Sequence, residues 1–186
     1  MMNDLWGGTS LLPDFETSRL FLRERTIADI EACLAMDRDP EVTKYVPGPW
    51  NDPKEHRHFL TGRIQAEFGP GLGYWSIFAK EQPDLFLGWV LLIPSDAIGP
   101  EIEIGWRLNR QARGNGFATE AARPIVVHAF KTVGVYRIIA NIHPENTASM
   151  RVSEKIGLRV TDDECLYNGL PCKAYAMTQD DFIATS

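Results

Sequence analysis

The sequence has few of the features that mark several large classes of protein. It has only three cysteines, Cys33, Cys165 and Cys172, an odd number with no metal-site spacing, which suits a reducing compartment. No apolar run approaches the roughly 20 residues that span a bilayer. The first residues lack the basic and then apolar order of a signal peptide. We therefore expect a cytoplasmic protein with no metal and no membrane contact.

An excess of positive charge is also missing. Lysine and arginine total 19 against 25 aspartate and glutamate residues, a formal net charge of -6. This balance disfavours nucleic acid as a partner and is more compatible with a cationic substrate such as an amine. With 44% hydrophobic residues in 186, the composition is that of one globular domain. We expect a single domain over 1–186, with 1–16 a loosely held lead-in.

Hydrophobic periodicity predicts a mixed α/β protein with a mostly antiparallel sheet and one strand–helix–strand crossover. Thr26 and Asp29 form a candidate capping box, Pro53 suits a first helical position, and 39–50 is rich in turns. Residues 82–84 are expected to connect two strands. The expected elements are a strand at 18–23, helices from Thr26 and Asp52, strands at 74–79, 85–93 and 101–108, a helix ending at Gly134, a strand at 135–143, a helix from Asn146 and a hairpin around Asn168-Gly169.

The stretch QARGNGFATEA, residues 111–121, places two glycines between a strand pattern and a helix pattern. Such a junction presents unpaired backbone N–H groups at the positive end of a helix, and glycine lets an anion approach closely. A nucleotide-binding P-loop would need Gly-Lys-Ser/Thr, and a dinucleotide turn would need a third glycine where Thr119 stands. The remaining alternatives are another kind of phosphate turn and a plain tight turn.

The pattern Gln111-x-x-Gly114-x-Gly116 resembles the acyl-CoA pyrophosphate loop of the GNAT N-acetyltransferase superfamily. Glu103–Leu108 resembles the strand before that loop, and Asn146–Leu158 resembles the second CoA-contacting segment. Thr17–Arg23 and Asp39–Val42 are similar to the branch that contains the ribosomal-protein-alanine acetyltransferases. The resemblance spans about residues 15–180 in the same order, as one domain would.

The resemblance implies a GNAT fold, in which a sheet of about seven strands opens into a V and about four helices flank it. It also implies acetyl-CoA as cosubstrate, with its pantetheine arm paired along the strand at 101–108 and its pyrophosphate on the glycine turn. Arg110 either serves the 3′-phosphate or is simply solvated. The implied cofactor-binding residues are Trp106, Leu108, Gln111, Arg113, Gly114, Asn115, Gly116, Phe117, Ala118, Thr119 and Asn146.

The reaction implied is direct transfer of acetyl to a primary amine in a ternary complex. A base must deprotonate the amine, and Glu103 is the candidate, although it also fits a solvated carboxylate. A backbone N–H near Gly105 or Trp106 would stabilise the oxyanion. The tyrosine that commonly protonates the thiolate is replaced by Ser153. Ser149 is therefore the candidate partner of the sulfur, with support of the helix cap as its alternative role.

The acceptor is not fixed by the sequence: it is either a protein N-terminus or a small-molecule amine. The loop at 46–50 and the second helix are expected to wall its pocket, and His56-x-His58 is interpreted as an exposed helical segment. A homodimer is left open, and Pro124 inside a helix has no functional explanation. The alternative function is a non-catalytic acyl-CoA-binding regulatory module, which the missing tyrosine would suit.

Overall fold

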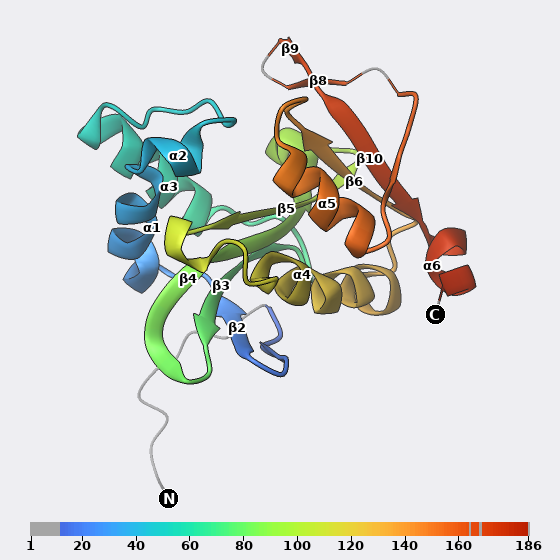
Figure 1. Ribbon diagram of the computed structural model, residues 1–186, viewed down its shortest axis with the longest axis horizontal. Helices are drawn as coiled ribbons and strands as arrows, with labels where there is room; N and C mark the ends of the chain where they lie inside the picture. The colour runs from blue at the N-terminus through green and yellow to red at the C-terminus, as the bar shows by residue number, and fades with distance from the viewer. Residues whose placement is uncertain (1–11, 164, 168, 186) are drawn as a thin grey trace, which may run out of the picture.

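The computed structural model describes residues 12–163, 165–167 and 169–185 (Figure 1). An eight-stranded sheet has the order β1-β2-β3-β4-β5-β6-β10-β7, and β8 and β9 form a separate hairpin. The strands are β1 (Phe15–Glu16), β2 (Leu20–Glu24), β3 (Gly73–Ala79), β4 (Gln82–Pro94), β5 (Ile102–Leu108), β6 (Arg137–Ile142), β7 (Arg159–Val160), β8 (Leu166–Tyr167), β9 (Leu170–Pro171) and β10 (Lys173–Thr178). The helices are α1 (Ile30–Asp37), α2 (Pro40–Thr43), α3 (Pro53–Gln65), α4 (Phe117–His128), α5 (Thr147–Lys155) and α6 (Gln179–Thr185).

The sheet opens between β5 and β6. All neighbouring strands are antiparallel except β5 and β6, which α4 connects in parallel. Their pairing is limited to Ile102 with Ile138 and Glu103 with Ile139, at the start of both strands. No pairing between the two strands continues beyond Glu103, which is where they diverge. The predicted mixed, mostly antiparallel fold with a V-shaped opening is confirmed.

Two hydrophobic cores cover the two faces of the sheet. Helices α4 and α5 pack on one face, where Ala121, Ala122, Ile125 and Val126 of α4 are buried. Helices α1 and α3 pack on the other face through residues such as Leu34 and Leu60. Strand β4 contributes to both cores because successive side chains alternate between faces: Val90 and Leu92 join the first, Leu91 and Ile93 the second. In Figure 1, α4 and α5 lie together in front of the sheet and α1–α3 gather at its left.

Several local predictions are confirmed. Thr26 and Asp29 form the capping box, although the first turn is a 3₁₀ turn (Ile27–Asp29) that leads into α1. The Asp52 side chain caps α3 by accepting hydrogen bonds from the amides of Lys54 and Glu55 at 2.9 and 3.0 Å. The hairpin around Asn168-Gly169 exists as β8 and β9; Asn168 itself lies outside the described residues.

Other segments differ from expectation. Residues 82–84 belong to β4 rather than to a connection, because Gln82 already pairs with Ala79 across a two-residue turn. The turn-rich segment at 39–50 contains α2, which the Asp39 carboxylate caps. Of the expected lead-in, residues 1–11 lie outside the described part; Leu12 is buried and β1 pairs with β2. Cys165 and Cys172, which the sequence left unpaired, form a disulfide across the β8–β9 hairpin.

Candidate active site

The glycine turn leads directly from β5 into α4. A 3₁₀ turn (Arg110–Ala112) follows β5, and Gly114 and Gly116 both have φ of +79°, a left-handed conformation that strongly favours glycine. The first helical hydrogen bond of α4 runs from the Glu120 amide to the Gly116 carbonyl at 3.0 Å. The amides of Phe117, Ala118 and Thr119 precede that bond, so they have no intrahelical acceptor. The turn has the geometry of an anion site.

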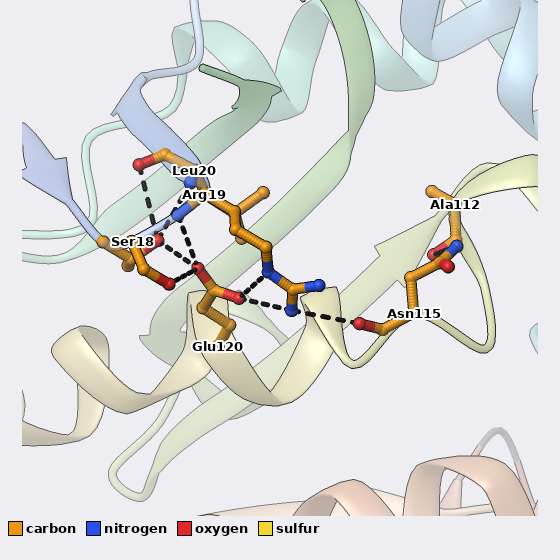
Figure 2. Close-up of polar contacts among 7 residues, drawn as sticks. Ser18, Arg19, Leu20, Ala112, Asn115 and Glu120 are labelled. Atoms are coloured by element: carbon orange, nitrogen blue, oxygen red, sulfur yellow. Dashed lines mark hydrogen bonds and ion pairs between the residues drawn. The ribbon is translucent and has the colours of Figure 1, made fainter. Parts of the chain in front are cut away.

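Glu120 links this turn, through hydrogen bonds, to the residues just before β2 (Figure 2). Its carboxylate accepts hydrogen bonds from Thr17 Oγ1 at 2.6 Å, Ser18 Oγ at 3.1 Å, and the Arg19 amide and Nε at 3.0 and 2.8 Å. Arg19 Nη2 also donates to the Asn115 carbonyl at 3.0 Å. Burial favours the neutral acid, but these hydrogen bonds outweigh it and lower the pKa of Glu120 to about 2. Residues about 100 positions apart thus hold the turn.

Two arginines fasten the other side of the turn to α2. Arg110 forms an ion pair with Asp39, with Nε donating to Oδ2 at 2.9 Å, and its side chain is 58% exposed. Arg113 Nη1 donates to the Glu41 carbonyl at 2.9 Å. Arg110 was expected either to serve the 3′-phosphate or to be solvated. The structure adds a third role, a surface ion pair with Asp39. Sequence spacing did not indicate these contacts because α2 was not expected.

The Asn115 side chain forms a hydrogen bond within its own turn, since its Nδ2 donates to the Arg113 carbonyl at 3.2 Å. Gln111 is exposed, and the Leu108 side chain is buried in the core, which leaves its backbone for any pairing with a ligand. These residues stay predicted cofactor-binding residues, with their backbone groups as the contacts that the geometry offers.

A cavity of 140 Å³ lies where β5 and β6 diverge; we call it the β5–β6 cavity. It brings together four of the predicted site residues, Glu103 and Trp106 from β5 and Asn146 and Ser149 from the start of α5. Its other lining residues are Tyr45, Val46, Trp89, Leu91, Ile104, Gly105, Arg107, Ala140, Asn141, Ile142 and His143.

Asn146 and Ser149 are linked at the N-terminus of α5. The Asn146 carboxamide accepts a hydrogen bond from the Ser149 amide at 3.2 Å, so the expected cap is present. Ser149 itself lines the β5–β6 cavity. Ser153 is fully buried, and its Oγ has no partner among the residues the structure describes. Ser149, rather than Ser153, is the α5 hydroxyl that lines the cavity.

Glu103 is a half-buried carboxylate on the wall of two adjacent cavities. Burial, and then the nearby Asp96 carboxylate, raise its pKa to about 7, and Arg63 opposes this shift. A base with a pKa near 7 is half deprotonated at neutral pH and still holds a proton well, which suits general base catalysis. Desolvation of this kind is also common at functional sites.

The second cavity, of 110 Å³, is lined by aromatic rings and by a buried polar cluster; we call it the aromatic cavity. The Arg107 Nη1 donates to Asp37 Oδ1 at 2.7 Å, and His56 Nε2 lies 3.5 Å from Asp37 Oδ2. His56 is therefore buried, and the interpretation of His56-x-His58 as an exposed segment was wrong for it, because α3 turns this face toward α1. The lining residues are Arg25, Asp37, Val46, Pro47, Trp50, Phe59, Leu60, Arg63, Tyr74, Trp89, Leu91, Ile93, Asp96, Ala97, Glu103 and Arg107.

A larger cavity of 470 Å³ borders residues 63–74 and contains none of the predicted site residues. It borders neither Glu103 nor any residue of β5 or β6. Sequence reasoning missed Tyr45 and His143, whose rings lie 5.0 Å apart in the β5–β6 cavity. The position of His143 directly after β6 was the available signal. For Arg25, Arg63 and Asp96 the sequence offered none.

Neither a metal cluster nor a spanning helix is found in the described part of the chain. Among residues 12–163, 165–167 and 169–185, no group of three or more His, Cys, Asp or Glu side chains is arranged to hold a metal ion. Within the same ranges, every helix is too short or too polar to cross a membrane.

Comparison with known proteins places this geometry in a family. Residues 19–159 match the model of the acetyltransferase (GNAT) domain. The uncharacterized N-acetyltransferase YnaD of Bacillus subtilis (strain 168) is 31% identical over 144 residues, covering 77% of this chain and 81% of YnaD. A GNAT-family acetyltransferase structure from Bacillus anthracis superposes with a TM-score of 0.73 at 27% identity, covering 90% and 99% of the two chains.

A more distant structure shares the fold. Spermidine N-acetyltransferase from Vibrio cholerae, in complex with CoA and spermine, has a TM-score of 0.70 at 17% identity, covering 90% of this chain and 99% of that one. The chain belongs to the GNAT acetyltransferases. It is an acetyl-CoA-dependent acetyltransferase, and acetyl-CoA is its cosubstrate.

Proposed function

We propose that the protein transfers acetyl from acetyl-CoA directly to a primary amine in a ternary complex. The observation that carries this proposal is the position of Glu103 on the wall that the β5–β6 cavity shares with the aromatic cavity. The donor would reach Glu103 from one side and the amine from the other. No covalent enzyme intermediate is then needed.

The donor would lie along the open edge of β5. Backbone groups of Trp106 and Leu108, which lie beyond the last β5 residue that pairs with β6, would pair with the pantetheine arm as an added strand does; the Leu108 carbonyl also accepts a hydrogen bond from Arg113 Nε at 3.4 Å. The amides of the glycine turn, Gly114–Thr119, would hold the pyrophosphate at the N-terminus of α4. Asn146 would contact the arm near the thioester, since it lines the same cavity as Glu103.

In the reaction, Glu103 takes a proton from the amine, directly or through a water molecule. An aliphatic amine has a pKa of ~8–10, so it must lose that proton before its nitrogen attacks the thioester carbonyl. The backbone N–H of Gly105 or Trp106 stabilises the oxyanion. The C–S bond breaks as the tetrahedral intermediate collapses; the departing thiolate accepts a hydrogen bond from the Ser149 hydroxyl and takes up the second proton that the nitrogen loses.

The acceptor amine belongs to a protein N-terminus or to a small molecule. The resemblance of Thr17–Arg23 and Asp39–Val42 to the ribosomal-protein-alanine acetyltransferases favours the first. The small volume of the aromatic cavity, 110 Å³, favours the second. We also keep a cytoplasmic location, one domain over 1–186 and a possible homodimer as parts of the proposal.

A thiol-release assay tests the proposal. The protein is incubated with acetyl-CoA and a panel of amino acids, simple amines, polyamines and peptides, and CoA thiol is titrated over time. Turnover on at least one amine is the expected result. Tight binding of acetyl-CoA with no turnover on any acceptor would instead favour a non-catalytic acyl-CoA-binding regulatory module.

A further inference from the structure

The aromatic cavity is not acidic, although the protein as a whole carries a net charge of -6. Its wall has three arginines and three carboxylic acids. Arg107 and Asp37 neutralise one another through their 2.7 Å ion pair. Arg25 and Arg63 remain, opposed by Asp96 and Glu103. This balance does not suit a polyamine, which needs an excess of acidic groups, and it suits a molecule that carries both charges.

Arg25 is a buried cation with unused hydrogen-bond donors. Its side chain is 4% exposed, and its Nε and Nη2 have no hydrogen-bond partner among the described residues. Its guanidinium stacks on the Tyr74 ring, 3.6 Å from the centroid. A guanidinium with two free adjacent donors matches the two oxygens of a carboxylate. Leaving such a buried charge unpaired is costly, so an anion in this cavity would be bound favourably.

Arg63 provides a second cation nearer to Glu103. It lies on α3, half-buried, and makes no ion pair within the described ranges; its guanidinium rests 5.5 Å from the centre of the Phe59 ring. Arg63 and Glu103 line the same cavity, and the Arg63 charge opposes the rise in the pKa of the Glu103 carboxyl. In an α-amino acid the amine and the carboxylate are separated by a single carbon, so both groups would lie within this one small cavity.

Most of the remaining cavity wall is apolar, apart from Tyr74 and from Trp89, whose Nε1 has no hydrogen-bond partner among the described residues. Side chains of Phe59, Leu60, Leu91 and Ile93 line it together with the Trp50 ring. None of these groups would compensate a polar side chain for lost hydration, whereas burial of an apolar side chain here is favourable. The volume of 110 Å³ fits one small molecule rather than a peptide.

We propose that the acceptor is a free amino acid with an apolar side chain, whose amine lies at Glu103 and whose carboxylate is held by Arg63 and Arg25. This assignment rests on the proposed acetyl transfer. The products are then the N-acetyl amino acid and CoA. The amine loses its positive charge on acetylation, so the product carries only the negative charge of its carboxylate.

Matched acceptors test the assignment, because they differ only in the carboxylate. L-Leucine is compared with 3-methylbutylamine, and L-phenylalanine with 2-phenylethylamine, by kcat/KM in the thiol-release assay. We expect the amino acid to be preferred about 10- to 100-fold, the range of a charge-assisted hydrogen-bonded pair. Arg63→Gln, which keeps a long helix-forming side chain, should lower this preference at least about 10-fold.

Arg57→Gln is the matched control, since Arg57 lies on the same helix but pairs with Glu31 at the surface. It should leave the preference unchanged. Preference for the decarboxylated amines, for spermidine or for a peptide would overturn the amino-acid assignment and leave the proposed transfer intact. A preference that survives Arg63→Gln would overturn the role of that arginine and, with it, the assignment.

A binding measurement separates this inference from the proposed function. Calorimetry with the CoA-saturated protein compares N-acetyl-L-leucine with N-acetyl-3-methylbutylamine and needs no turnover. Tighter binding of the carboxylate, lost in Arg63→Gln, supports the assignment even if no acceptor is acetylated. Equal binding of both products overturns it, whatever the turnover assay shows.

Discussion

At the scale of single residues, the raised pKa of Glu103 links its proposed role as the base to the stability of the fold. A folded-state pKa of about 7, above the ordinary 4.5, means that the folded protein binds more protons than the unfolded chain between these values. Stability is therefore lost as the pH rises through this window. Burying this carboxylate has a stability cost at neutral pH, which is expected where a group serves chemistry rather than folding.

Glu103→Gln should remove both effects. We expect kcat to fall about 10²- to 10⁴-fold at pH 7 and the rise of wild-type activity through about pH 7 to disappear. The variant should be more stable than wild type at pH 8, by about 1–3 kcal/mol, and equally stable at pH 4. Urea unfolding at both values measures this. Glu101→Gln, on the same strand segment but paired with Arg137 at the surface, is the control and should change neither.

Which residues surround Glu103 could be predicted only in part. Glu103 and Ser149 were found because each belongs to a motif that is local in the sequence. Arg25 and Arg63 were not, because they reach the cavity from β2's end and from α3, and a lone arginine carries no local pattern. Contacts between distant elements depend on packing, which periodicity does not specify.

At the scale of elements, the glycine turn depends on backbone conformation more than on space. A Cβ built on Gly114 meets no protein atom within 4 Å, yet its φ is +79°. Gly114→Val should therefore strain the turn and place a branched side chain where the phosphate approaches. We expect the Kd for acetyl-CoA to rise at least about 10-fold, as measured by calorimetry.

Gly134→Val is a closely matched control for that experiment. Gly134 has φ of +76° and equally open surroundings, but it ends the helical segment far along the chain from the turn. It should lower stability to a similar extent and leave the Kd unchanged. If both variants weaken acetyl-CoA binding equally, the effect is one of general strain and the phosphate-turn assignment fails.

Helix α4 carries an internal proline that the structure accommodates without ending the helix. Pro124 has no N–H to donate to the carbonyl four residues earlier, a loss that costs ~3 kcal/mol in a helix interior. Pro124→Ala should raise the free energy of unfolding by about 1–2 kcal/mol, since the more flexible unfolded chain offsets part of the gain. Urea unfolding measures it, with Arg123→Ala as the control. Unchanged or lower stability would mean that Pro124 packs better than alanine does.

At the scale of the whole molecule, the order of elements from β2 to α5, apart from the short helix α2, followed from periodicity, caps and turn residues. The strand and the helix at the end of the chain, β10 and α6, were not predicted from these signals. Strand β10 (Lys173–Thr178) lies between β6 and β7 and is buried on both faces, so it shows no polar alternation. The short helix α6 follows it after a capping box, in which the Asp181 amide donates to Thr178 Oγ1 at 3.2 Å and Asp181 Oδ2 accepts from the Thr178 amide at 3.0 Å. This local signal was overlooked, whereas tertiary packing rather than local propensity determines β10.

The carboxylate of Glu120 connects α4 to the residues just before β2, and its titration should report on that connection. Its pKa is lowered to about 2, so its contribution to stability is complete above pH 4.5 and is lost as the pH falls toward 2. Glu120→Gln should cost about 1–2 kcal/mol at pH 7, allowing for solvent screening, and little at pH 2. Urea unfolding across this range measures the difference, with the exposed turn residue Glu81→Gln as control.

The same variant distinguishes a contact that only stabilises the fold from one that also shapes the binding turn. Arg19 loses its carboxylate partner in Glu120→Gln, and its guanidinium keeps its contacts with the Asn115 carbonyl and with the Phe117 ring at the start of α4. A looser turn must be ordered when acetyl-CoA binds, so the Kd should rise several-fold together with the loss of stability. Lost stability with an unchanged Kd would show that the turn keeps its shape through Arg110 and Arg113 alone. The contacts to α2 would then be the ones that prepare the protein for its cosubstrate.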